Sequence, residues 1–314
     1  NLSVSNNPAP TNRTFELNGV YNNSYIVRVD GSVWDTNKNA KVMDDVRAIG
    51  QMMDVVVGHY ITFAIKQDDT LWTLPFAIDG RSLTVNIDCP AQKLMDNVKS
   101  VNFSKYIDGF LVLKNDNSLW TCGIKIETFK SNGSWNQRSV LIPPEKIMDE
   151  VASFVYKPYF TTTVLAIKTD GSLWGWGGNE GGELGNGTKE AQSSPIKIMD
   201  NVVSVAFGFY QKNYSPSVYG STFALKADGT LWACGNNDNY LLGTGDKTER
   251  LTPVKVMEDV IAIDASDHAA AVKSDGSLWT WGYVVGTQGS SRPVKMADGV
   301  ASVTCGGSVV HCIK

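Results

Sequence analysis

Residues 166–188 read AIKTDGSLWGWGGNEGGELGNGT, and this stretch decides the fold. A short apolar run ends at Lys168, Asp170-Gly171 follows as a turn signal, and a second run begins at Leu173-Trp174 and alternates as a strand does. The stretch therefore predicts an antiparallel β-hairpin. We expect positive φ at both central residues of its turn, as in the tight turns that Asp-Gly favours.

The same phrase recurs along the whole chain. Its six copies end at Trp34, Trp72, Trp120, Trp174, Trp232 and Trp279. A second phrase, Lys-apolar-Met-acid-x-Val, lies between the copies, as at residues 197–202. Two interleaved markers with a common period of roughly 50 residues predict a repeat architecture. Each unit contains about four short strand-like runs and no sustained helical periodicity, so we predict an all-β, seven-bladed β-propeller that forms one domain over residues 1–314.

Repeat four carries the marks of a known family. Its residues 170–188 combine the Asp-Gly-Ser-Leu-Trp phrase with Gly-x-Asn-x-x-Gly-x-Leu-Gly-x-Gly, and repeat five keeps most of both. On these residues the chain resembles the RCC1-repeat family, the propellers named after the regulator of chromosome condensation. The resemblance covers residues 14–314, although repeats one to three lack the second motif. It implies seven blades and a role in binding.

The resemblance also implies how the ends of the chain meet. The sequence stops after half a repeat, residues 300–314, so the last blade lacks its outer strands. The N-terminal segment is expected to supply one of them, either from residues 2–4 or from residues 14–19; otherwise residues 1–13 are a linker. The plan is similar to that of the bacterial seven-bladed β-lactamase inhibitory protein, which also ends in a half unit and binds its enzyme through loop aromatics.

Composition excludes several classes of protein. The 314 residues carry a formal net charge of -4, which argues against nucleic-acid binding because that needs a basic face. No run of 18 apolar residues exists, so we expect no membrane insertion. Together with the resemblance, these features favour a bacterial protein that is secreted or on the cell surface, acts as a monomer and carries no cofactor.

The residues that most often carry chemistry are few. Cys122 and Cys234 lie two residues after a marker tryptophan, where other repeats have Trp176 or Trp281, so we expect both to be buried as small hydrophobic residues. Cys305 and Cys312 flank an expected hairpin turn, and whether they form a disulfide is left open. No Cys-x-x-Cys motif suggests a zinc site.

Other reactive side chains fit structural roles. None of His59, His268 and His311 has a second histidine at metal-ligand spacing, and His268 occupies a repeat position that favours a role in a turn. The acid after methionine recurs in almost every repeat, which favours a repeated turn over an ion site; its copies include Asp44, Asp96, Asp149 and Asp200. We therefore predict no catalytic and no metal-binding residues.

Aromatic side chains cluster between the first and second strands of repeats two to five, in segments that we expect to be loops. The candidate partner-binding residues are Tyr60, Tyr106, Tyr156, Tyr159, Phe160, Phe209, Tyr210, Tyr214 and Tyr219. Equivalent loops of a propeller project from one face, and tyrosines there provide contact area at low entropic cost. Capping of each blade by its own aromatics explains the clustering equally well.

Three functions follow from this reading. The first is a non-enzymatic module that binds a protein partner through the aromatic loops. The second is a carbohydrate- or cell-wall-binding propeller that stacks the same aromatics on sugars. The third is an enzyme, a lyase or hydrolase with its site at the channel mouth, which would need clustered carboxylates or histidines on one face.

Overall fold

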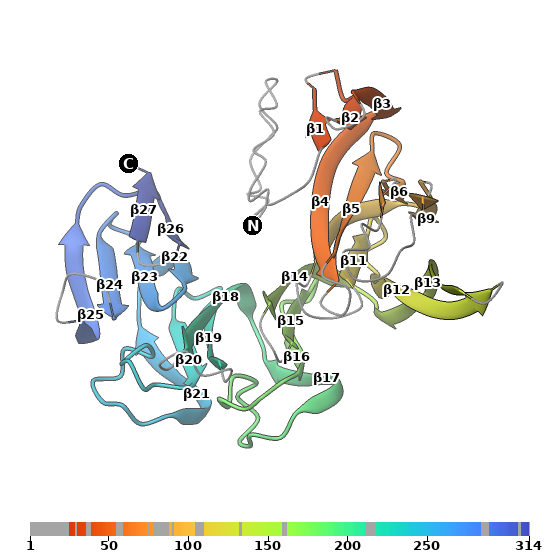
Figure 1. The fold of residues 1–314 in the computed structure, drawn as a ribbon. Coiled ribbons are helices and arrows are strands. Elements are labelled where there is room, and N and C mark those ends of the chain that lie inside the picture. The colour runs from red at the N-terminus through yellow and green to blue at the C-terminus, as the bar shows by residue number, and fades with distance from the viewer. Residues whose placement is uncertain are drawn as a thin grey trace. The chain divides into compact units, whose positions relative to one another are not determined.

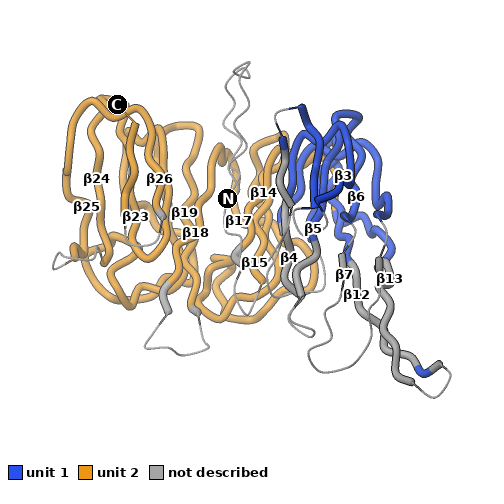
Figure 2. Tube along the Cα trace, turned by 45° about the horizontal axis from the view of Figure 1, so that its top comes forward, with its two compact units in different colours: residues 1–147 blue, residues 148–314 orange. Residues whose placement is uncertain are grey.

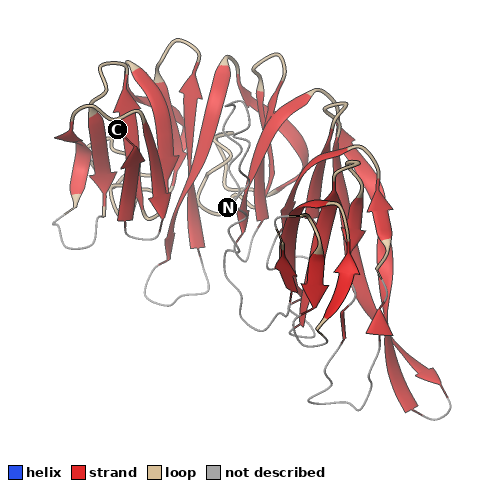
Figure 3. Ribbon diagram, turned by 90° about the horizontal axis from the view of Figure 1, so that it is seen from above, coloured by secondary structure: helices blue, strands red, loops and turns tan. Residues whose placement is uncertain are grey.

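Strands make up all the regular structure described in the computed structural model. That description covers residues 25–28, 30–35, 39–54, 59–74, 76–77, 88–89, 91–103, 110–131, 134–158, 162–211, 218–283, 289–306 and 309–313. No helix occurs in these ranges, so none of them contains a helix able to cross a membrane (Figure 3). The all-β prediction is confirmed.

The chain groups into two compact units, Asn1–Ile147 and Met148–Lys314 (Figure 2), and each is described by itself. In the first unit the sheets follow three repeats. Repeat one contains β1 (Tyr25–Val27), β2 (Val33–Asp35) and β3 (Ala40–Met43). Repeat two contains β4 (Val46–Asp54), β5 (His59–Lys66), β6 (Leu71–Thr73) and β9 (Lys93–Met95), with the small pair β7 (Phe76–Ala77) and β8 (Asp88–Cys89) between the last two. Repeat three contains β10 (Val98–Phe103), β11 (Phe110–Lys114), β12 (Leu119–Ser131) and β13 (Ser134–Met148).

The second unit contains three full repeats and a half repeat (Figure 1). Repeat four is β14 (Val151–Pro158), β15 (Thr162–Lys168), β16 (Leu173–Gly177) and β17 (Gln192–Met199). Repeat five is β18 (Val202–Gln211), β19 (Val218–Lys226), β20 (Leu231–Gly235) and β21 (Arg250–Met257). Repeat six is β22 (Val260–Ala265), β23 (His268–Lys273), β24 (Leu278–Gly282) and β25 (Ser290–Ala297), and the half repeat is β26 (Ser302–Gly306) with β27 (Val309–Ile313).

Each full repeat is a four-stranded antiparallel meander, as expected of a propeller blade. In repeat four, Ala166 pairs with Trp174 and Leu165 with Gly175, so the apolar run and the tryptophan run form one hairpin. Every first strand of a full repeat begins with a β-bulge one residue long, as between Val202 and Ser204. The bulge explains why Val203 and Ile261 are exposed, since each is the extra residue of its strand.

The expected turn geometry was wrong in one detail. Gly171 has φ +79°, but Asp170 is not in the positive-φ region. The N–H of Gly171 donates to the Lys168 carbonyl, and the N–H of Lys168 donates to the Ser172 carbonyl. The turn is therefore a three-residue connection with a single left-handed residue, which Asp69 and Asn117 supply in repeats two and three.

The repeated acid after methionine belongs to the turn that leads into the next repeat, as predicted. Asp200 pairs with Lys197 at 2.7 Å, and the following Asn201 has φ +61°. Val202 then donates its N–H to the carbonyl of Gly171. Equivalent left-handed residues precede the other first strands: Asp45, Asn97, Glu150, Asp259 and Gly299. Within each compact unit, these turns hydrogen-bond the hairpin turn of one repeat to the start of the next.

The core lies between consecutive sheets rather than inside any one of them. One cluster joins Phe223 and Leu231 of repeat five to Trp281 of repeat six, and the Phe223 and Trp281 rings meet edge to face with centroids 6.1 Å apart. In the first unit, Phe63 of repeat two contacts Phe110 of repeat three at 4.7 Å. A single sheet thus buries its apolar faces only by stacking on its neighbours.

Candidate functional site

The marker tryptophans are engaged within their own repeats. In repeat four the Trp174 Nε1 donates to Ser172 Oγ at 2.9 Å, and Ser172 donates its N–H and its hydroxyl to Asp170 at 2.8 and 2.6 Å. Lys168 Nζ lies over the Trp174 ring, 5.9 Å from its centroid. The arrangement recurs at Trp34, Trp72, Trp120, Trp232 and Trp279. These tryptophan side chains therefore stabilise the hairpins of their own repeats and are not a surface free to stack on a ligand.

The turn carboxylates are held in their charged form. Hydrogen bonds from the side chain and then the backbone of Ser172 keep the pKa of Asp170 below its usual range. The pKa values of Asp30, Asp68, Asp116, Asp228 and Asp275 are lowered in the same way by the serine or threonine two residues on. These hydrogen bonds between the aspartate and the serine or threonine therefore stabilise each hairpin turn electrostatically.

Repeats four and five each carry a segment that reaches over the next repeat. We call residues 179–190 and 237–248 the latch segments. Each is organised by one buried asparagine: Asn179 Nδ2 donates to the carbonyls of Thr188 and Glu190 at 3.0 and 3.1 Å, while its Oδ1 accepts from the N–H of Leu184 at 2.9 Å. Gly187 N–H then donates to the Leu251 carbonyl of repeat five at 2.8 Å. The Gly-x-Asn motif is thus an inter-repeat connection.

The candidate aromatics do not all lie in loops, contrary to expectation. Tyr60 lies in β5, Tyr156 in β14, Phe209 and Tyr210 in β18, and Tyr219 in β19. The first hairpin of repeat five is long because its alternating β-branched and aromatic residues extend the ladder: Tyr210 pairs with Tyr219, and Phe209 pairs with Gly220. The other candidates, Tyr106, Tyr159, Phe160 and Tyr214, lie outside the described residues.

Where their side chains are described, these aromatics are half-buried. Phe209 and Tyr219 are partly exposed on the long hairpin of repeat five. Tyr156 is also half-buried, and burial raises the pKa of its phenol above the ordinary range. Such side chains combine packing within the blade with a remaining surface for contact.

The thiols behave as expected where the structure describes them. Cys122 and Cys234 are buried, and burial raises the pKa of Cys122 to about 11 and that of Cys234 to about 12, which suppresses the nucleophilic thiolate. Cys305 and Cys312 are free, because Cys305 pairs with Val310 and Cys312 with Val303, one diagonal step apart on the ladder. The open question of a disulfide between them is answered for this structure.

His268 has a structural place, as predicted. It begins β23, is fully buried, and its Nδ1 lies 2.7 Å from Asp267 Oδ1. Nearby, Asp264 Oδ2 accepts the N–H of Cys305 at 2.8 Å and so ties β26 to repeat six; burial raises the pKa of this carboxyl. Within the described ranges, no group of three or more His, Cys, Asp or Glu side chains could hold a metal ion.

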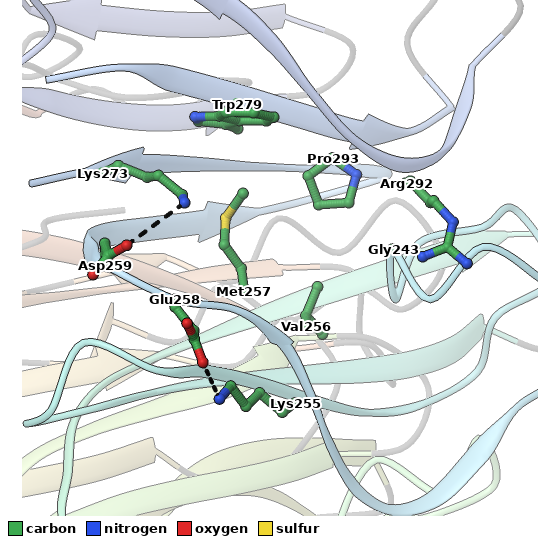
Figure 4. Close-up of a pocket in the computed structure, with 10 residues that line it drawn as sticks. All are labelled: Gly243, Lys255, Val256, Met257, Glu258, Asp259, Lys273, Trp279, Arg292 and Pro293. Atoms are coloured by element: carbon green, nitrogen blue, oxygen red, sulfur yellow. Dashed lines mark hydrogen bonds and ion pairs between the residues drawn. The ribbon is translucent and has the colours of Figure 1, made fainter. Parts of the chain in front are cut away.

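The sequence alone did not point to a groove between repeats five and six. It is open, has a volume of about 590 Å³, and is lined by the end of β21 and the turn after it, by β23 and β24, and by the start of β25. Figure 4 shows Arg292 and Gly243 at one end, Lys273 and Asp259 at the other, and Met257 and Pro293 between them. The sequence feature that could have indicated this groove is Arg292. It is a charged residue at a repeat position where repeats four and five have Ser194 and Thr252.

Comparison with known proteins agrees with this geometry. The profile of the Regulator of chromosome condensation (RCC1) repeat matches residues 170–210 and 228–272, which include the Asp-Gly turns of repeats four and five and both latch segments in full. The chain contains RCC1 repeats in these two segments. The resemblance to the RCC1-repeat family found in the sequence is thereby confirmed, and the matched segments lie in repeats four, five and six.

The similar RCC1 proteins differ widely in length. Human E3 ubiquitin-protein ligase HERC2 is 28% identical over 174 residues, which are 49% of this chain and 3% of HERC2. The ultraviolet-B receptor UVR8 of Arabidopsis thaliana is 32% identical over 124 residues, 38% of this chain and 27% of UVR8. The chain thus spans a minor part of these curated relatives.

Solved structures share the fold. Yeast RCC1 (Prp20), in its complex with Kap60, matches with a TM-score of 0.53 at 17% identity, over 80% of this chain and 63% of Prp20. Human WBSCR16 matches with a TM-score of 0.56 at 16% identity, over 85% of this chain and 74% of WBSCR16. A second Prp20 structure is described together with its binding to Gsp1p and histones. At these identities the likeness is one of fold.

Proposed function

We propose that this chain is a non-enzymatic propeller that binds a protein partner through the aromatics of its first hairpins. One observation carries the proposal. Tyr106, Tyr159 and Tyr210 each lie eight residues after the valine that begins the first strand of their repeat, Val98, Val151 and Val202. Equivalent positions in successive propeller blades present their side chains on the same face.

The chemistry of this position suits recognition of a protein. Tyrosine offers a large, rigid and amphipathic surface with few rotatable bonds, and such residues dominate binding energy at interfaces. Prp20, whose structure shares this fold, is bound to Kap60, which supports a protein-binding role for the present chain. We extend the proposal to a bacterial protein that is secreted or on the cell surface, as the resemblance to the inhibitory protein implies.

Single substitutions of the hairpin tyrosines test the proposal. A partner is first identified by crosslinking the intact chain to secreted and cell-surface proteins of its own environment, and its affinity is then measured directly. Tyr60→Ala, Tyr106→Ala, Tyr159→Ala and Tyr210→Ala should each weaken binding by about 1–4 kcal/mol. Tyr283→Ala is the matched control, since Tyr283 is exposed but lies after β24, outside the first hairpins.

Two outcomes would contradict the proposal. All four variants could bind the partner with normal affinity while melting at the wild-type temperature. Alternatively, a glycan array could show binding of sugars that the same four substitutions abolish, which would favour the carbohydrate-binding function.

A further inference from the structure

We propose that the groove between repeats five and six is a second binding site, one that takes an extended peptide segment bearing a carboxylate beside aliphatic or aromatic side chains. The site lies on β21, β25, the turn between repeats five and six, and the ends of β23 and β24 that carry Lys273 and Trp279, and none of the candidate aromatics lines it. It therefore goes beyond the function proposed above and is tested without it.

Arg292 supplies the site for the carboxylate. Its side chain is exposed, and in the described part of the chain its guanidinium has no hydrogen-bond or ion-pair partner. The guanidinium lies directly against the latch backbone, since a Cβ added at Gly245 would lie 2.6 Å from Arg292 Nη2. Gly245 N–H also donates to the Ser291 carbonyl at 2.8 Å. A positioned, unpaired guanidinium fits a carboxylate with two parallel hydrogen bonds.

The other charges of the groove are matched. Lys255 forms an ion pair with Glu258, and Lys273 Nζ lies 3.9 Å from Asp259 Oδ2. Three cations and two carboxylates leave one positive charge without a partner, that of Arg292. A nucleic acid or a polyphosphate would bring many negative charges toward Glu258 and Asp259 and would be repelled. A ligand with a single carboxylate is the charge complement.

The middle of the groove is apolar. Met257 is 9% exposed and belongs to the core cluster of repeats five and six, while Val256 and Trp279 pack against that cluster. Pro293 forms the opposite side beside Arg292 (Figure 4). The groove is open and lies along the strands, so it suits an extended chain with apolar side chains rather than an enclosed small molecule.

The equivalent positions in repeats four and five show that the arginine distinguishes this groove. The equivalent residues of repeats four and five include the same lysine, tryptophan and proline: Lys197, Trp232 and Pro253. At the Arg292 position, however, repeat five has Thr252. Thr252 occupies the same place in a well-formed strand, so Arg292→Thr removes the charge with little risk to the fold.

The experiment uses the full chain and a defined set of probes. These are fluorescein-labelled octapeptides in which one Asp or Glu is separated by one to four residues from a Leu-Leu or Leu-Phe pair, together with matched peptides containing Asn or Gln in its place. Binding is followed by fluorescence polarisation. At least one acidic peptide should bind below 1 mM, and its neutral counterpart should bind about 10- to 100-fold more weakly.

The protein variants locate the site. Arg292→Thr should weaken the same peptide about 10- to 100-fold. Lys295→Thr should leave binding unchanged, because Lys295 lies on the same strand but pairs with Asp298 outside the groove. Tyr210→Ala should also leave it unchanged, which separates this site from the hairpin surface. The proposal is overturned if no acidic peptide binds below 1 mM, if neutral peptides bind equally well, or if Arg292→Thr has no greater effect than Lys295→Thr.

Discussion

Gly177 ends the third strand of repeat four in a backbone conformation that other residues rarely adopt. Its φ is +93°, and an added Cβ would lie 1.9 Å from the carbonyl oxygen of Thr162 on the neighbouring strand. Gly299 also has positive φ, +72°, but nothing lies within 4 Å of its added Cβ. Substitution of these two glycines therefore distinguishes the effect of a steric clash with the backbone from that of a strained φ alone.

Gly177→Ala should destabilise the protein by at least about 3 kcal/mol, because the methyl group collides with backbone that cannot move without breaking the hairpin. Gly299→Ala, the control, should cost about 1–2 kcal/mol, the strain of a left-handed alanine. Urea unfolding measures both. Equal losses would show that packing at Gly177 is not the constraint.

Acid should weaken the hairpin turns. The folded state lowers the pKa of Asp170, Asp228 and Asp275, so these carboxylates stabilise the fold above the unfolded pKa of about 3.9 and lose that contribution as the pH falls through their lower folded values. In a variant with all three changed to asparagine, the fall in urea midpoint between about pH 5 and pH 2 should be smaller than in the wild type. An identical fall would contradict this assignment.

At the scale of the elements, the latch segments join repeats that also share side-chain packing and backbone hydrogen bonds. Asn237 is fully buried and donates through Nδ2 to the carbonyls of Asp246 and Thr248 at 2.7 and 3.1 Å, while Oδ1 accepts from Leu242 N–H at 2.9 Å. The latch then receives a hydrogen bond from repeat six, from Trp281 Nε1 to the Leu241 carbonyl at 2.8 Å. The Asn237 side chain thus fixes the backbone conformation in which the latch segment contacts repeat six.

Asn237→Ala should destabilise the protein by about 2–3 kcal/mol, because it leaves buried backbone groups without partners. Asn239→Ala, in the same latch but only half-buried, should change stability by less than about 0.5 kcal/mol. Urea unfolding gives both values, and hydrogen exchange should show faster opening of residues 238–248 in the first variant alone. Equal effects of the two substitutions would remove the organising role of Asn237.

For the whole molecule, the open question is how the half repeat is completed. In the described part of the chain, β27 pairs only with β26, and Val309 and Ile313 are 53% and 68% exposed. Val294 and Met296 on β25 are also exposed, whereas their counterparts Val254 and Val256 are half-buried. An apolar edge of this kind needs a covering strand. The N-terminal segment predicted for that role lies outside the described residues, so closure stays a prediction.

Two truncations test the closure. Deletion of residues 1–20 should lower the melting temperature by at least about 5 °C, because it removes both candidate strands. Deletion of residues 1–13 should have little effect if residues 14–19 provide the strand, and an effect as large as the longer deletion if residues 2–4 do. An unchanged melting temperature for both would reject closure by this segment.

The hairpin of each blade could be predicted from the sequence, because the contacts that shape its turn are local in the chain. Asp170, Ser172 and Trp174 lie within five residues, and the left-handed position after Asp170 follows from its glycine. The same nearness allowed the burial of Cys122 and Cys234 to be predicted from their register after a marker tryptophan. The turn type and the extent of the first hairpins were misjudged, since ladder pairing such as Tyr210 with Tyr219 depends on the partner strand.

The contacts between neighbouring repeats could not be predicted from the sequence. The hydrogen bonds between a latch and the next repeat join residues that are 40 apart, as for Trp281 and Leu241, or more, as for Gly187 and Leu251. The Arg292 guanidinium likewise lies against a backbone from the preceding repeat. No spacing rule within one repeat contains such a contact, because stacking of two sheets creates it. The groove between repeats five and six therefore became visible only once the two sheets were seen together.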